Sequence, residues 1–330
     1  MDANVLERLL AERSLLGATL AGADLAGRDL AGCRFEDCDL SSALLSGASL
    51  RGASFIRCSL RGARIDGVTA QGAEFVSVDF SGGSAKKGDF TKGFFKACDF
   101  SAAVFSGAVL VRADCHQCRF SETDLEGADL TRWSARATDL RRVRFANNPM
   151  EKAFLAKSNL GGQRFPGCQL ALTQFPDCQL QGADFSGLTL DRTRFPGAQM
   201  EGAVLAGVKG LYVALKGANL KQADLRGARF ECSELSDALL GGALCAGAVF
   251  EKSRLVGADC RRSSWVGAKL IYCDCSHAQF DGADFSGADL GDANLHAVSD
   301  AGTVWSGAHL AGVKRSDAAL ARAENWQPSL

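Results

Sequence analysis

Residues 282–295 read GADFSGADLGDANL, and this stretch states the rule that the rest of the chain follows. Phe285, Leu290 and Leu295 lie five residues apart, and each is preceded by alanine two positions earlier and by Asp or Asn one position earlier. An α-helix has a period of about 3.6 residues and a strand a period of 2, so neither predicts a sustained repeat of five. The stretch therefore indicates a repeat architecture.

The same repeat extends over almost the whole chain. Every fifth residue from Leu20 to Leu310, here called position i, is mostly Leu or Phe, and only Gly210 and Asp300 break the pattern. Position i−2 is small or moderately apolar, whereas polar residues and Gly concentrate at i−1, i+1 and i+2. Because alternate residues of extended backbone face the same side, i and i−2 are predicted to point inward. The remaining two residues must turn a corner, which predicts a solenoid of short sides.

A second period gives the length of one coil. At position i+2, Gly recurs every 20 residues from Gly27 to Gly307, with Lys87 and Asn147 as exceptions, and the other i+2 columns are much poorer in Gly. Gly and Asn tolerate positive φ. We therefore expect one corner of each 20-residue coil to need that conformation.

The chain resembles the pentapeptide-repeat proteins, whose A(D/N)LXX unit matches Ala23-Asp24-Leu25, Ala128-Asp129-Leu130, Ala218-Asn219-Leu220 and Ala288-Asp289-Leu290. The resemblance covers about residues 16–315. It implies an all-β solenoid, a right-handed quadrilateral β-helix with four pentapeptides in each of about 15 coils. Inside it, Phe35, Phe55, Phe75 and Phe95 should stack on one side, and Phe80, Phe100 and Phe120 on another.

Three segments are predicted. Residues 1–15 form an N-terminal helical cap, with an amphipathic helix over 4–13; residues 16–315 form one repeat domain, because each coil contacts only its neighbours; and residues 316–330 form a C-terminal helical cap or dimerisation element. In the last segment Ser316 or Asp317 caps the helix, and Leu320 and Trp326 can pack on the last coil. The family resemblance implies a homodimer through this element, and a monomer with a covered end is the alternative.

Charge and cysteine positions argue against binding of nucleic acid or membrane by overall charge, and against a disulfide or zinc framework. The net charge is −1 and the pI about 6.4, which gives no global case for binding nucleic acid or an anionic membrane. Of the 13 cysteines, only Cys232 lies outside positions i and i−2, so they are predicted to fill the core in a reducing compartment. Cys115-His116-Gln117-Cys118 resembles half a zinc site, but both sulfurs are at inward positions and no second pair follows.

No enzyme, cofactor or metal site is expected. The histidines (His116, His277, His296 and His309) are all assigned to outward positions, and no Gly-rich phosphate loop or nucleophile–base pair can be placed. His277 and His296 should be neighbours on adjacent coils, as a surface pair. Neither a signal peptide nor a membrane-spanning segment is predicted, so we expect a bacterial protein of the cytoplasm.

One group of outward residues is a candidate partner site. The 20-residue step places Lys92, Arg112, Arg132 and Lys152 in one column, and Lys96, His116 and Arg136 in a column one corner further on; we call these seven residues the basic face. Like charges about 5 Å apart on adjacent strands repel one another. Either nearby acids such as Glu126 and Glu151 or an anionic partner should compensate them.

Two segments depart from the repeat. Inward positions between 133 and 163 become irregular, with Trp133, Ala135, Asn148 and Gln163, and glycine replaces the core residue at Gly210. We expect local bulges or a kink at both places. Whether they are functional or structural stays open at this point.

The first functional hypothesis is a non-enzymatic protein–protein interaction scaffold, an accessory of a bacterial assembly such as a secretion apparatus. The alternative is a DNA-mimicking inhibitor or protector of type II topoisomerase (gyrase), as some members of the resembled family are. That mimicry needs an acidic surface, whereas this chain is near neutral and carries a basic face. Direct binding of nucleic acid through the basic face ranks third.

Overall fold

Short parallel strands, paired in steps of 20 residues, build the fold. The computed structural model describes residues 11–324 and residue 326, so the predicted helix over 4–13 lies almost entirely outside the described residues. Seven strands form one sheet in chain order: β1 Ser14–Leu16, β2 Arg34–Glu36, β3 Ser54–Ile56, β4 Glu74–Val76, β5 Phe94–Lys96, β6 Asp114–His116 and β7 Ser134–Arg136. Two more, β8 Lys209–Leu211 and β9 Arg229–Glu231, pair with each other.

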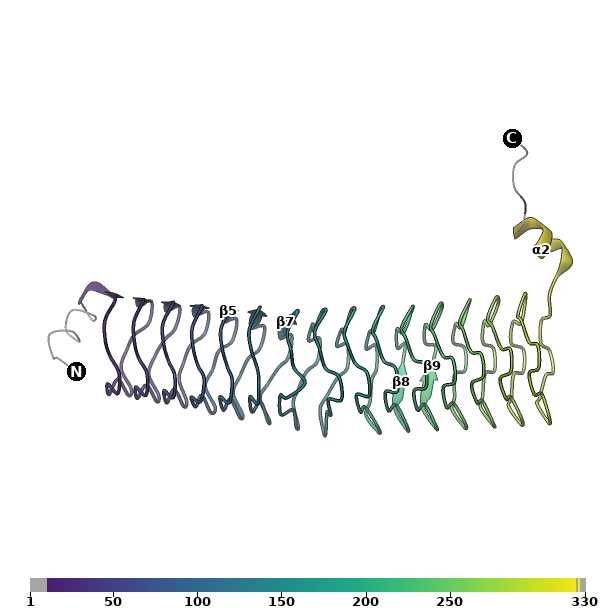
Figure 1. Cartoon of the computed structure of the whole chain (residues 1–330), viewed down its shortest axis with the longest axis horizontal. Helices are drawn as coiled ribbons and strands as arrows, with labels where there is room; N and C mark the ends of the chain where they lie inside the picture. Colours follow the sequence, from purple (N-terminus) through teal and green to yellow (C-terminus); the bar gives the residue numbers. More distant parts are fainter. Residues whose placement is uncertain (1–10, 325, 327–330) are drawn as a thin grey trace. The chain divides into compact units, whose positions relative to one another are not determined.

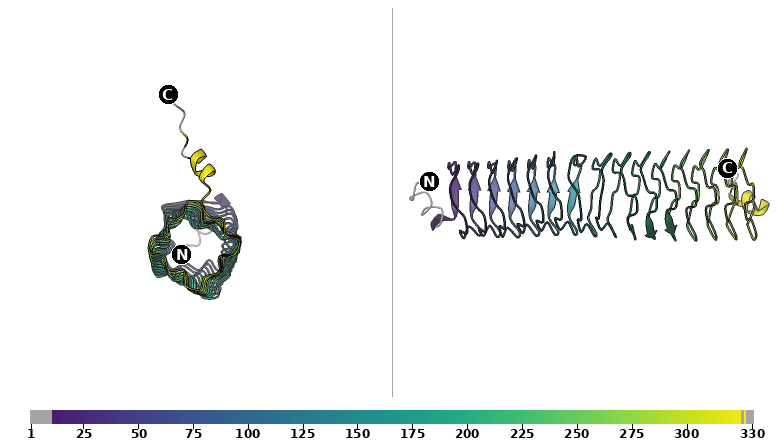
Figure 2. Two further views of the ribbon diagram at one scale, coloured as in Figure 1. Left: turned by 90° about the vertical axis from the view of Figure 1, so that its right-hand side faces the viewer. Right: turned by 90° about the horizontal axis from the view of Figure 1, so that it is seen from below.

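The chain divides after Gln174 into two compact units. In the first unit, drawn from purple to teal, β1–β7 lie next to one another in chain order along one side of the stacked coils (Figures 1 and 2). In the second unit the coils carry β8 and β9 and are joined by isolated parallel bridges, such as Asn219↔Leu239 and Asp284↔Val304. Both units are therefore stacks of coils, and the predicted β-solenoid is confirmed. The predicted count of coils is approximate, because the described ladders are interrupted in places.

The predicted inward positions form the core. The ring centroids of Phe35 and Phe55 lie 4.5 Å apart, and those of Phe75 and Phe95 lie 5.0 Å apart, with nearly parallel planes. Phe100 stacks at 4.8 Å on Phe120 in the second ladder. Both predicted aromatic stacks are thus confirmed. Stacked, fully buried rings supply much of the apolar burial that stabilises successive coils.

Position i−2 has a second role that the repeat pattern did not reveal. Small polar side chains there donate a hydrogen bond to the carbonyl of the core residue 23 positions earlier. Thr123 Oγ1 donates to Phe100 O at 2.8 Å, Ser253 Oγ to Phe230 O at 2.6 Å, and the Cys58 thiol to Phe35 O at 3.4 Å. A buried hydroxyl or thiol is therefore satisfied without leaving the core.

Corners on all four sides of the coil, not on one in four, have positive φ, and between Gly17 and Gly312 only the corner residue Arg142 is without it. Besides the glycines, charged corner residues adopt this conformation, among them Asp37 (53°), Arg112 (58°) and Lys252 (59°). The expectation of a single such corner was wrong. The Gly column reflects a preference for Gly at one side of the coil. At the other sides, the backbone hydrogen bonds between successive coils hold the left-handed conformation despite a cost of about 1–2 kcal/mol per non-Gly residue.

The Asp or Asn at i−1 also has a structural role. Asp24 Oδ1 accepts a hydrogen bond from Ala26 N at 3.0 Å, and Asp284 Oδ1 accepts one from Ser286 N at 2.9 Å. Asn219 accepts the corresponding bond from Lys221 N at 3.2 Å. An acceptor two residues before the corner amide stabilises the turn, which explains the D/N choice in the repeat.

The first irregular segment keeps its hydrogen bonds inside the coil. Trp133 is fully buried, and its Nε1 donates to Cys115 Sγ at 3.3 Å. Asn148 Nδ2 donates to the carbonyls of Leu125 and Ala128 at 2.6 and 2.9 Å. These side chains are satisfied structural elements of the core.

Gln163 repeats this arrangement three pentapeptides further along, because its Nε2 donates to the carbonyls of Leu140 and Val143 at 2.7 and 2.8 Å. At these inward positions, polar side chains take the place of apolar ones, and each bonds to carbonyls of the preceding coil.

The bulge expected at Gly210 is absent. Gly210 lies in β8 and pairs in register with Phe230 of β9, so no extra residue is inserted. A Cβ on Gly210 would lie 2.5 Å from Val213 Cγ2 and 3.3 Å from Leu190 O. The neighbouring Val213 therefore occupies the space that a larger core residue would fill, and the coil keeps its length.

The last described helix is α2, Ala318–Glu324. It begins where the sequence predicts, and Asp317 is its N-cap, because Asp317 Oδ1 accepts from Ala319 N at 2.7 Å. The helix stands out from the side of the last coils of its unit (Figures 1 and 2). Trp326 is 71% exposed, so its predicted packing on the last coil was wrong. Among the described helices, none has the length and apolar character needed to cross a membrane.

Candidate functional site

The basic face lies in the first unit, and its residues occupy strand ends in one column and corners of the coil in the other. Lys96, His116 and Arg136 end the strands β5, β6 and β7, and the register pairs Lys96 with His116 and His116 with Arg136. These side chains point outward because the residue before each, at position i, points inward. One of the two predicted columns is therefore a continuous ladder of exposed basic or imidazole groups.

The second column occupies corners with positive φ. Lys92, Arg112, Arg132 and Lys152 have φ between 58° and 60° and are all exposed. Their amides donate to the next coil in the same manner, for example Lys92 N to Val111 O at 2.9 Å and Arg112 N to Thr131 O at 3.0 Å. The backbone ladder thus sets the spacing of the four cations, and their long side chains extend into solvent.

Little compensating charge reaches the basic face. Within residues 11–324 and 326, none of its seven side chains forms an ion pair with a carboxylate. Glu126, one of the acids expected to compensate them, instead pairs with Arg144 at 2.6 Å. Arg136 lies 5.3 Å above the ring of Phe154. The basic face is therefore a surface of largely uncompensated positive charge.

One acid lies within the basic face. Asp114 belongs to β6, between Arg112 and His116, and its Oδ1 is buried without a hydrogen-bond partner among the described residues. Outward residues Phe94 and Ser134 flank it on β5 and β7. A partner that docks here can supply a donor to this oxygen as well as acceptors to the cations.

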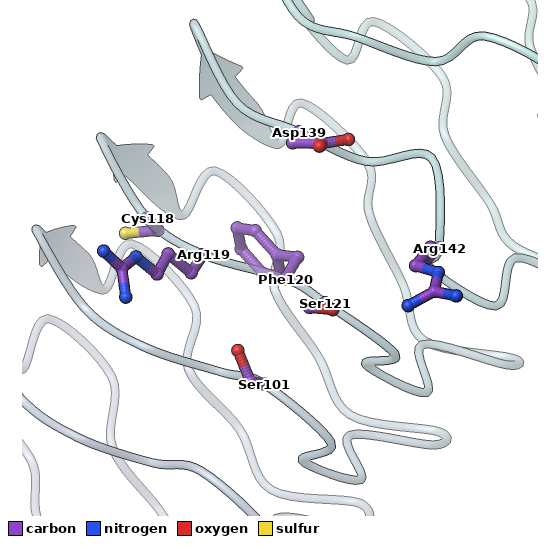
Figure 3. A pocket seen from close by; sticks show the side chains of 7 residues that line it. All are labelled: Ser101, Cys118, Arg119, Phe120, Ser121, Asp139 and Arg142. Carbon is purple, nitrogen blue, oxygen red and sulfur yellow. The ribbon is translucent and has the colours of Figure 1, made fainter.

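A hollow of about 200 Å³ lies close by in the same unit. It is lined by Ser101, Cys118, Arg119, Phe120, Ser121, Asp139 and Arg142. Figure 3 shows the Phe120 ring in its middle, with Ser101 and Asp139 on opposite sides. In the described ladders Arg119 bridges to Asp99 but not to Asp139, and the hollow lies at this interruption. No sequence signal marks it.

The charges around this hollow are already paired. Arg142 lies 3.2 Å from Glu122, and Arg119 lies 3.9 Å from Asp99. The hollow therefore offers less free charge to a ligand than the basic face does.

The cysteines pack as predicted. All 13 are free; 12 are buried and Cys232 is partly exposed. Burial raises the pKa of the Cys245 and Cys275 thiols above the ordinary value, because the thiolate would lose its hydration. Cys115 and Cys118 lie inside the coil whereas His116 is exposed, so the structure does not assemble the half zinc site.

The assignment of all histidines to outward positions was wrong for His296, which is buried. Its Nε2 lies 3.1 Å from Glu324 Oε2 of α2, and its Nδ1 accepts a hydrogen bond from Asp317 N at 3.1 Å. The helix covers a ring that the repeat alone places on the surface. His296 holds the pKa of the Glu324 carboxyl below its usual range by hydrogen bonding to it.

Family models give a direct match to this chain. The model of pentapeptide repeats matches in 8 copies, within residues 18–55, 43–82, 98–132, 153–187, 168–207, 213–244 and 266–296. These ranges cover more than half of the chain. No curated protein matches it.

Solved structures give loose similarities. HetL, a pentapeptide repeat protein involved in heterocyst differentiation regulation from the cyanobacterium Nostoc sp. strain PCC 7120, is 18% identical over 95% of this chain and 96% of its own, with a TM-score of 0.26. Full-length QnrB1, a plasmid-mediated fluoroquinolone resistance protein, is 21% identical over 60% of this chain and 93% of its own, with a TM-score of 0.26. Tailspike protein 3 of bacteriophage CBA120 is 10% identical over 96% and 56%, with a TM-score of 0.32.

Scores this low carry no argument about function. The family assignment rests on the matched repeats and agrees with the inward Leu/Phe column and the 20-residue ladder. The chain belongs to the pentapeptide repeat family.

Proposed function

We propose that this protein is a non-enzymatic interaction scaffold whose basic face docks on an acidic surface of a partner protein. The observation that carries the proposal is the pair of adjacent columns, Lys92 to Lys152 and Lys96 to Arg136, whose side chains form no ion pair with a carboxylate among the described residues. Each column repeats at the strand spacing of about 4.8 Å. An extended or flat acidic surface can therefore meet several cations at once.

The charge pattern favours recognition over stability. Like charges on neighbouring strands repel each other and slightly destabilise the free protein. A partner carboxylate near each cation relieves that repulsion and speeds encounter. A bacterial assembly, such as a secretion apparatus, is the class of partner that we propose for such a scaffold.

Affinity capture from a bacterial lysate tests the proposal. The bait proteins are the intact chain, the double variant Arg112→Glu/Arg132→Glu, and the control Lys252→Glu/Arg262→Glu. The control also reverses two exposed corner residues with positive φ (59° and 57°), but in the other unit. We expect an acidic protein to be captured by the intact chain and the control, and to be depleted at least about tenfold by the first variant. Equal recovery by all three baits contradicts the proposal.

Protection or inhibition of type II topoisomerase is the second candidate. The near-neutral net charge and the basic face weigh against imitation of DNA. Capture of gyrase subunits would favour this candidate, and a supercoiling assay would then test it. Direct nucleic-acid binding predicts that affinity falls steeply with salt and with the reversal at Arg112 and Arg132.

The location and assembly of the scaffold belong to the same proposal. A cytoplasmic location agrees with the use of buried free cysteines in the core. A homodimer through residues 316–330 remains a prediction, which sedimentation of the full chain can test.

A further inference from the structure

His277, His296 and Glu324 meet at the junction between the last coils and α2. His277 is a corner residue with φ of 60°, and its amide donates to His296 O at 2.8 Å, so the ladder itself holds the two residues side by side. Their ring centroids lie 5.5 Å apart at an angle of 81°. The two histidines are 19 residues apart rather than 20, which places them across adjacent coils with a shift of one position.

Helix α2 brings the third group. Glu324 Oε1 lies 3.3 Å from His277 Nε2, and Glu324 Oε2 lies 3.1 Å from His296 Nε2. Each residue offers one possible metal-ligand atom, and these three atoms all lie within 4.8 Å of one another. His296 is buried, while His277 and Glu324 are more exposed, so the group is anchored on one side and open on the other.

We propose that these three residues bind a divalent transition-metal ion of the Zn²⁺ type, and that the bound ion ties α2 to the coils. Two imidazole nitrogens and one carboxylate form a donor set that zinc accepts, with a fourth position left for water. In a tetrahedron with metal–ligand bonds of about 2.0 Å, ligand atoms lie about 3.3 Å apart. Each nitrogen–oxygen distance is close to that edge, but the two distances run to different oxygens of Glu324, so the carboxylate must turn to place one oxygen near both rings.

The site must rearrange slightly to bind. Because Asp317 N–H donates to His296 Nδ1, the neutral ring carries its proton on Nε2, which points to Glu324. A metal at Nε2 takes the place of that proton, and the ring then carries its proton on Nδ1. Asp317 N–H must then move aside, which costs one hydrogen bond. The amide of Asp317 is therefore a specific reporter of metal binding.

Titration of the full chain with Zn²⁺ and with Co²⁺, after removal of metals with a chelator, tests the site. We expect one equivalent to bind, with visible d–d bands of Co²⁺ and without the near-ultraviolet band of a cobalt–thiolate bond. His277→Ala and Glu324→Gln, which change exposed side chains, should each weaken binding at least about tenfold. The matched control is His309→Ala, because His309 is also exposed and pairs with a carboxylate, Asp289, at 2.8 Å, outside the group.

The same samples supply a second reading. Metal should shift the Asp317 amide resonance and slow hydrogen exchange in α2 of the intact chain and of His309→Ala, but not of Glu324→Gln. A thiolate band, affinity equal in Glu324→Gln and the intact chain, or no binding would each overturn the proposal. In the last case the three residues act only as a hydrogen-bonded clasp for the helix.

Discussion

Corner residues show how the ladder overrides local preference. Glycines such as Gly247 (φ 65°) and charged residues such as Arg112 (58°) adopt the same backbone conformation. Hydrogen bonds to both neighbouring coils hold such corners, since Arg112 N donates to Thr131 O and the adjacent Val111 O accepts from Lys92 N. Residues that rarely adopt positive φ are therefore accepted there. The identity of a corner residue is therefore weakly constrained by the fold.

Substitutions at two glycines can distinguish the energetic cost of positive φ from the cost of packing a new side chain. A Cβ on Gly247 meets nothing within 4 Å, so the cost of Gly247→Ala comes from positive φ alone, and we expect a loss of about 1 kcal/mol. Gly241 lacks positive φ, and its nearest neighbour to a new Cβ is Arg261 O at 3.8 Å, so Gly241→Ala should be neutral or slightly stabilising. Guanidinium unfolding of both variants measures the difference. A loss of equal size in both would contradict this account.

At the scale of an element, the same inward hydrogen bond joins successive coils in many places. Cysteine, serine, threonine, asparagine and glutamine each occur at an i−2 position that donates to the carbonyl 23 residues earlier, as at Cys58, Ser253, Thr123, Asn148 and Gln163. Thr138 differs, because its hydroxyl donates to Arg136 O. Asn148 does so to Leu125 O and also accepts from Ala146 N at 2.9 Å. Polar residues in the irregular segment are therefore structural.

Replacing this buried amide should be costly. Asn148→Ala leaves Ala146 N and the Leu125 and Ala128 carbonyls with fewer partners, and we expect a loss of about 2 kcal/mol. Asn148→Thr should retain part of that stability, because Thr123 and Thr173 make the corresponding inward bond at 2.8 and 2.6 Å. Denaturant unfolding of the two variants checks this. An alanine variant as stable as the threonine variant would show that the bond contributes little.

The sequence predicted the elements unevenly, and the reason is physical. The inward Leu, Phe and Cys positions were predictable, because the repeat keeps a register of five. The arrangement at His296 was not, because its burial depends on α2, which lies outside the repeat. A spacing of 19 between His277 and His296 was the available signal, but only the helix supplies Glu324. The basic face followed from the 20-residue step, whereas the pairing of Glu126 with Arg144 did not.

For the molecule as a whole, carboxylates at i−1 link stability to pH. The pKa of Asp284 is lowered by hydrogen bonds from Ser286, and those of Asp139 and Asp224 by the guanidinium groups of Arg141 and Arg226. A folded-state pKa below the unfolded value, about 4, means that the stabilisation is present above that pH and is lost as the pH falls through the folded value. Such carboxylates occur in both units.

We therefore expect the unfolding midpoint in denaturant to fall steadily as the pH is lowered from about 5 to below 3. Asp284→Asn keeps an acceptor for Ser286 N, as Asn219 does for Lys221 N, and should reduce the dependence slightly without loss at neutral pH. Asp284→Ala should lose stability at both ends of the range. Midpoints that do not change with acidification would rule out this linkage.

The corners with positive φ also bear on how such a protein can evolve. Their side chains leave the coil at fixed intervals and touch little of the core, so lysine, arginine, aspartate and glycine can replace one another there at modest energetic cost. The spacing is inherited from the backbone, while the chemical identity at each step is free to drift. A lineage of such proteins can therefore exchange one binding partner for another through substitutions at the corner positions, while the fold stays the same.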